Sequence, residues 1–91
     1  MERYNNVLRM LTKLARGDDY YAAIASALVE VLAGARLYYQ DKALEAALDA
    51  ACTVVQVLAY KLAPHCKALS QGFEFVAKEI EKTLEQEGGE P

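Results

Sequence analysis

The sequence has few of the residues from which catalytic and metal sites are usually built. Its 91 residues include one histidine, two cysteines and no tryptophan. The chain has no Glu-x-x-His pair, the motif with which many helical bundles hold metal ions. The single histidine, His65, directly precedes Cys66, and a nucleophilic pair of this kind would also need a base and an oxyanion site that no motif supplies. We therefore expect no enzyme activity, no metal and no cofactor.

Proline is also scarce, and the alternation of β-branched and polar residues that marks strands is absent. Pro64 is the only proline before Pro91, and alanine, leucine and valine dominate the composition. Hydrophobic residues make up 54% of the chain, which argues against disorder. A chain of this length has room for one hydrophobic core. The sequence therefore predicts a single all-α domain.

Two cysteines are too few for a disulfide framework, and their spacing disfavours a bond between them. Cys52 lies well before a chain reversal expected at Pro64, and Cys66 lies just after it. In an antiparallel hairpin their levels would differ by roughly 13 Å, whereas a disulfide needs Cα atoms within about 7 Å of each other. We predict two buried free thiols. The N-terminal residues are polar and contain no apolar leader segment, which predicts a cytoplasmic location.

Apolar residues recur at helical spacing in four segments that are separated by Gly17, Asp41 and Pro64. The expected helices cover residues 2–16, 19–40, 42–63 and 65–86, and residues 87–91 form a polar tail. Short connections make sequential helices antiparallel neighbours, so residues 1–86 are predicted to form an up-down four-helix bundle. The alternative is that the last two helices are joined by a kink at Pro64.

The third predicted helix has two apolar rows and is therefore expected to lie centrally, in contact with more than one neighbour. One row is made of leucine, alanine and valine and the other of alanine and valine: Leu44, Leu48, Ala51, Val55, Leu58 and Leu62 in the first, and Ala43, Ala47, Ala50, Val54 and Val57 in the second.

Residues 20–39 form the most unusual stretch, because these twenty residues include only two charges and have a tyrosine pair at each end. A helix that is apolar nearly all round must be covered on several sides. We predict that it mediates homo-oligomerisation, as a dimer or a higher oligomer, and that the chain is a non-enzymatic structural or protein-interaction module of the subunit, adaptor or inhibitor type. The predicted interface residues are Tyr20, Ala23, Ala27, Glu30, Val31, Gly34 and Tyr38.

Lipid is the alternative partner for this apolar surface. In this reading residues 20–39 and 43–63 form a helical hairpin in a membrane-associated or extracellular filament subunit of the pilin-like kind, because tyrosines favour the membrane interface. Charges inside both limbs, such as Glu30 and Asp49, disfavour it. Nucleic acid is not expected as a partner, since the net charge is −3 and the basic residues near the N-terminus are scattered.

Overall fold

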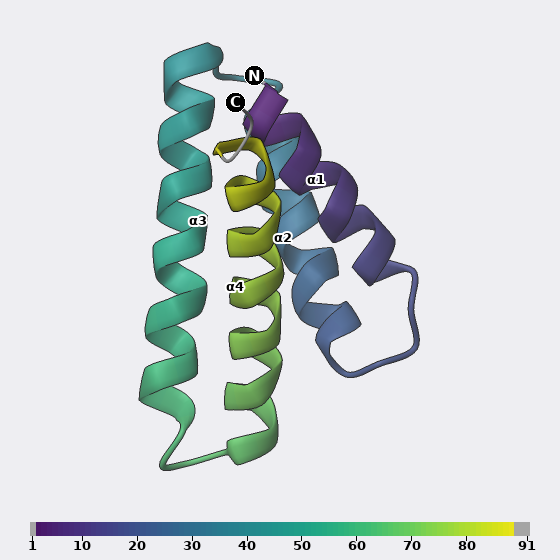
Figure 1. Cartoon of the computed structure of the whole chain (residues 1–91), viewed down its shortest axis with the longest axis vertical. Coiled ribbons are helices and arrows are strands. Elements are labelled where there is room, and N and C mark those ends of the chain that lie inside the picture. Colours follow the sequence, from purple (N-terminus) through teal and green to yellow (C-terminus); the bar gives the residue numbers. More distant parts are fainter. Residues whose placement is uncertain (1, 89–91) are drawn as a thin grey trace.

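The computed structural model describes residues 2–88, with side chains described through residue 86, and this part of the chain contains helices and no strands. Figure 1 shows two antiparallel hairpins packed against each other. The prediction of an all-α antiparallel four-helix arrangement is confirmed. The helices are α1 (Glu2–Ala15), α2 (Tyr21–Ala35), α3 (Asp41–Leu62) and α4 (Lys67–Gly88).

The chain reverses at Pro64 as predicted, and the kinked continuous helix is wrong. The α3 helix ends at Leu62, whose carbonyl accepts the amides of His65 and Cys66 at 2.9 and 2.8 Å. The α4 helix then runs to Gly88, two residues beyond the predicted helix end. The remainder of the predicted tail, residues 89–91, lies outside the described residues.

The second helix is shorter than predicted. It ends at Ala35 and not at Gln40, and the amides of Arg36, Leu37 and Tyr38 donate to carbonyls three residues earlier, at 3.3, 3.1 and 3.1 Å, in a tighter turn. Gln40 is extended, with φ −122° and ψ 170°, and sets the direction of α3. At 1.5 Å per residue, α1 and α2 are about 21–23 Å long and α3 and α4 about 33 Å, so one hairpin is shorter than the other.

The hydrophobic core lies between the two hairpins and receives side chains from all four helices. Fully burying one such side chain stabilises the fold by about 1.5–3 kcal/mol relative to leaving it exposed. The largest fully buried residues are Tyr4, Val7, Leu11, Leu32, Leu48, Val55, Val76 and Ile80.

The third helix contacts more than one neighbour, as predicted, but it lies at the edge of the bundle and not at its centre. It packs extensively on α4, less on α2 and least on α1, whereas α4 packs on α3 and also on α1. The first apolar row of α3 supplies core residues, including Leu48 and Val55. The second row faces outward along most of its length, as the exposure of Val54 and Val57 shows.

Candidate interaction surface

The predicted interface residues all lie outside the core. Six of the seven are exposed, and Gly34 is half-buried. Residues three and four apart share one side of a helix, so the outer face of α2, which we define as Ala23, Ala27, Glu30, Val31 and Gly34, is a continuous strip. Tyr20 and Tyr38 lie just before and just after the helix, with exposed fractions of 61% and 80%. The structure therefore leaves the outer face of α2 uncovered within one chain, whereas the ring of Tyr20 lies toward Gly72 of α4.

The outer face of α2 consists of small or apolar residues and one carboxylate. A Cβ atom built on Gly34 would meet no other atom within 4 Å, which shows open space at that point of the helix. Glu30 is exposed and takes part in no ion pair with another described residue, so its charge is solvated in the single chain. Val31 is 63% exposed and is the largest apolar side chain of the face. The outer face of α2 is thus mostly apolar and exposed, and its small side chains leave the helix backbone near the surface.

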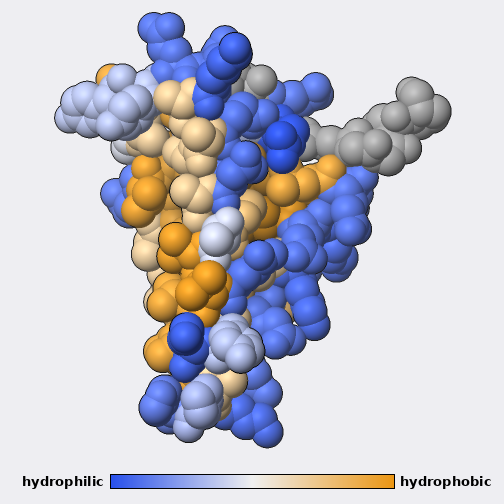
Figure 2. All heavy atoms as spheres, turned by 90° about the vertical axis from the view of Figure 1, so that its left-hand side faces the viewer, coloured by the Kyte–Doolittle hydropathy of each residue, from blue (hydrophilic) through white to orange (hydrophobic). Residues whose placement is uncertain are grey.

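A second exposed apolar surface lies on α3. We define the α3 outer row as Ala43, Ala46, Ala50, Val54 and Val57, all of which are exposed. Figure 2 views the molecule from the side on which α3 lies in Figure 1, and apolar side chains follow this side for much of its height. The sequence predicted most of this row as apolar, with another helix of the same chain packed against it. In the fold no described helix of the chain covers the row.

The two acidic residues in the first half of α3 after Asp41, Glu45 and Asp49, lie away from its outer row, whereas Lys42 and Lys61 lie near its two ends. Glu45 Oε1 is 3.3 Å from Arg3 Nη1, and Asp49 Oδ1 is 3.9 Å from Arg3 Nη2, so both carboxylates face the side where α1 lies. Gln56, on the same side of α3, donates to Glu81 Oε1 of α4 at 2.8 Å. Between the two ends of α3, its outer row carries no charge.

One helix of the described chain, α3, is long and apolar enough to cross a membrane by length and composition, and only 22% of its most apolar stretch is buried in the structure. A core helix of a soluble bundle has most of its apolar residues buried, and α3 does not. The other helices of the chain therefore leave a large part of the apolar surface of α3 exposed.

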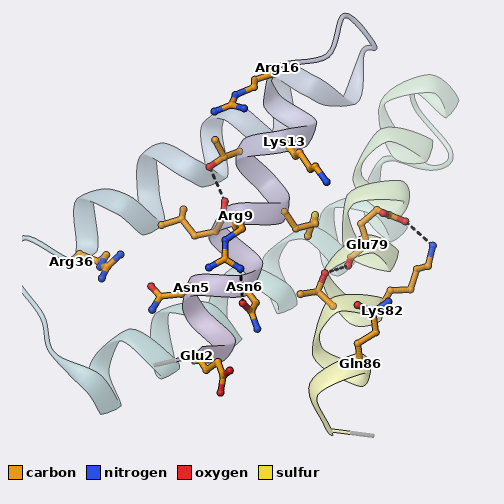
Figure 3. Close-up of a pocket in the computed structure, with 14 residues that line it drawn as sticks. Glu2, Asn5, Asn6, Arg9, Lys13, Arg16, Arg36, Glu79, Lys82 and Gln86 are labelled. Atoms are coloured by element: carbon orange, nitrogen blue, oxygen red, sulfur yellow. Dashed lines mark hydrogen bonds and ion pairs between the residues drawn. The ribbon is translucent and has the colours of Figure 1, made fainter. Parts of the chain in front are cut away.

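An open groove of about 1110 Å³, lined by charged, polar and apolar side chains, follows both flanks of α1. In Figure 3, Arg36 lies on the α2 side of α1, whereas Lys82 and Gln86 lie on the α4 side. Five basic and two acidic side chains line it, so the charged groups of the lining are mostly positive. The charged and ionisable lining residues are Glu2, Arg9, Lys13, Arg16, Arg36, Glu79 and Lys82.

The groove offers little reactive chemistry. Arg9 Nη1 donates to Asn6 Oδ1 at 2.9 Å, and Lys82 Nζ donates to Glu79 Oε2 at 3.2 Å, so several lining side chains interact with their own neighbours. The described residues that line the groove include no histidine, cysteine or serine, the side chains that most often act as nucleophile or base. Its chemistry is that of an open, charged helix surface.

The two cysteines are free thiols, as predicted, but only one is partly buried. Cys52 packs against the core, and burial raises the pKa of its thiol, with a further contribution from the nearby Asp49 carboxylate. Cys66 is exposed at the start of α4, so the prediction that it is buried is wrong. The α3–α4 turn lies at the protruding end of the longer hairpin, where no other helix covers it.

No group of three or more histidine, cysteine, aspartate or glutamate side chains in the described residues is placed to hold a metal ion. Comparisons of the chain with protein-family models, with curated proteins and with solved structures give no match.

Proposed function

We propose that this protein is a non-enzymatic interaction module that self-associates through the outer face of α2, with the α3 outer row contributing. One observation supports this most directly. Nine large apolar or aromatic side chains of the described residues are exposed, and eight of them belong to α2, its flanking turns or α3. They are Tyr20, Val31, Leu37, Tyr38, Tyr39, Val54, Val57 and Tyr60, and the ninth is Leu69 of α4.

The energetic reason is the removal of this surface from water. Soluble monomers rarely expose contiguous apolar patches larger than a few hundred Å², and burial contributes about 25 cal/mol per Å². The alanines of both helices permit axes to approach to the short end of the usual 8–10 Å range. Exposed tyrosines suit the rim of such a contact, because the ring packs on apolar groups while the hydroxyl reaches water.

Light scattering coupled to size-exclusion chromatography tests the proposal over a range of concentrations. We expect an oligomer for the unmodified protein. Ala27→Arg, at the middle of the α2 face, should yield monomer or precipitate. Gln86→Arg is the matched control, since it adds the same charge at an exposed position in the groove beside α1. A protein that stays monomeric at high concentration, or an Ala27→Arg variant that associates as well as its control, would overturn the proposal.

Lipid contact is the second candidate function, favoured by the length and apolar composition of α3. The structure weakens the hairpin form of this hypothesis, because α2 has 15 residues and spans about 22 Å, short of the roughly 30 Å hydrocarbon core. Glu45 and Asp49 would also enter the bilayer with α3. Flotation with phosphatidylcholine vesicles distinguishes the two candidates: co-flotation favours lipid contact, and an oligomer left at the bottom of the gradient favours self-association.

A further inference from the structure

We infer that the partner is a second copy that docks antiparallel across α3, about a two-fold axis at Ala50. This inference rests on the proposed self-association and specifies its geometry. A two-fold interface brings the same surface of both chains together. The α3 surface must therefore be complementary to itself, and its side-chain sizes provide the evidence.

In an antiparallel pair centred on Ala50, residue numbers that face each other add up to 100. Ala43 then faces Val57 of the second copy, Ala46 faces Val54, and Ala50 faces its own equivalent. Each valine is thus placed opposite an alanine, so larger and smaller side chains alternate across the contact. The α3 outer row has alanines in its N-terminal half and valines in its C-terminal half, which is the distribution that this register requires.

A parallel pair would fit less well. Each residue would then face its own equivalent, so valines would meet valines at one end and alanines would meet alanines at the other. The two helices would be held apart at the valine end and would leave unfilled space at the alanine end, which loses packing contacts. The antiparallel pair also places the N-terminus of each helix beside the C-terminus of the other, which is the favourable arrangement of their dipoles.

The second copy also covers a part of α3 that its own chain leaves open. In Figure 1, α2 and α3 diverge in the direction of the α3–α4 turn. Val54, Val57 and Tyr60 lie in the half of α3 nearer that turn. Their exposed fractions are 51%, 48% and 77%. The two-fold axis places the partner's α2 and its α2–α3 turn, with the exposed Leu37 and Tyr38, beside this half.

The available surface is large enough for a stable dimer. Val31, Leu37, Tyr38 and the three large side chains of α3 together expose on the order of 800 Å², which matches what each partner contributes to a standard interface. The α3 outer row alone would supply less, so the contact needs both helices. This agrees with the involvement of the α2 face in the proposed function.

Disulfide trapping tests the register in a background in which Cys52→Ala and Cys66→Ser remove both native thiols. The variants are Ala50→Cys, Ala43→Cys, Val57→Cys and the double variant Ala43→Cys with Val57→Cys. Positions 43 and 57 are about 21 Å apart on one helix, so the double variant cannot form the bond within a chain. Circular dichroism confirms helix content before oxidation, and non-reducing gels count covalent dimers.

We expect Ala50→Cys and the double variant to form covalent dimers, and each of the other two single variants to remain mostly uncross-linked. Dimers of Ala43→Cys alone and of Val57→Cys alone would establish a parallel pair and overturn the inference. An oligomer in light scattering that none of the variants traps would overturn the α3 geometry and leave self-association standing. A monomeric cysteine-free background and a monomeric unmodified protein would overturn both.

Discussion

The hydroxyl of Tyr4 on α1 donates a hydrogen bond to the backbone carbonyl of Leu32 on α2. This carbonyl lies in the last turn of α2, where the amide of Arg36 donates to Ala33 at 3.3 Å. Carbonyls at a helix end lack intrahelical partners unless another group supplies one. The guanidinium of Arg36 also lies 5.6 Å from the centre of the Tyr4 ring. One fully buried side chain therefore anchors the end of α2 to α1.

Replacing Tyr4 by phenylalanine should destabilise the fold, because the Leu32 carbonyl loses its donor while remaining buried. We expect a loss of about 1–2 kcal/mol in the free energy of unfolding, measured by urea denaturation at one protein concentration. Tyr21→Phe is the matched control, since it makes the same chemical change where the hydroxyl donates to an exposed acceptor, Asp19 Oδ2, outside the proposed interface. Equal stabilities of the two variants would show that the Tyr4 hydrogen bond contributes nothing.

Alkaline pH should also destabilise the protein through Tyr4. Burial raises the pKa of the Tyr4 hydroxyl, and the Arg36 charge offsets part of this rise. Above the ordinary tyrosine pKa of about 10, the unfolded chain releases this proton while the folded chain still holds it. The free energy of unfolding therefore falls as pH increases from about 10 toward the folded-state pKa. Urea denaturation between pH 9 and 11 should show a shallower decline for Tyr4→Phe than for the unmodified protein.

The C-terminal ends of α2 and α3 differ in how well the sequence predicts them. Pro64 disfavours helical geometry in the residue before it, so the α3–α4 turn could be predicted. Residues 36–40 include no glycine or proline, and their apolar character continues that of α2. The helix nevertheless ends at Ala35, close to the point where Tyr4 of α1 donates to the Leu32 carbonyl and its ring faces the Arg36 guanidinium. Such contacts depend on the folded arrangement and leave no local signal.

The candidate surface was predictable in part for a similar reason. Helical spacing alone placed Ala23, Ala27 and Val31 on one side of α2, and the structure leaves this side exposed. The same spacing identified most of the apolar row on α3, but periodicity does not specify whether its partner is another helix of the chain, a second copy or lipid. Only the position of α3 at the edge of the bundle showed that its own chain leaves this row open.

Two helical glycines should respond differently to the same substitution. Gly34→Ala adds a methyl group where the single chain has no atom within 4 Å, so for the monomeric chain we expect a gain of about 0.5 kcal/mol from reduced backbone entropy. Gly72→Ala would place its Cβ 3.0 Å from Ile24 Cδ1 and 3.2 Å from Tyr20 Cε2. Because Ile24 is buried, we expect this crowding to cancel the gain or to cost about 1 kcal/mol.

Thermal unfolding of the two glycine variants at equal protein concentration measures this difference. Matched concentrations are necessary because association changes apparent stability. A Gly72→Ala variant that raises the midpoint as much as Gly34→Ala would show that the contact between α2 and α4 at this point is loose.

The two thiols should react at clearly different rates in the folded protein. Cys66 is exposed, whereas Cys52 is half-buried and has a raised pKa. A raised pKa leaves less of the reactive thiolate at pH 8, and burial also restricts access of the reagent. We expect Cys52 to react with a disulfide reagent such as DTNB at least ~10-fold more slowly than Cys66. Cys66→Ser should remove the fast phase and leave the slow one, while denatured, unreduced protein should release two equivalents. Two equally fast thiols in the native protein would mean that α3 does not hold Cys52 against the core.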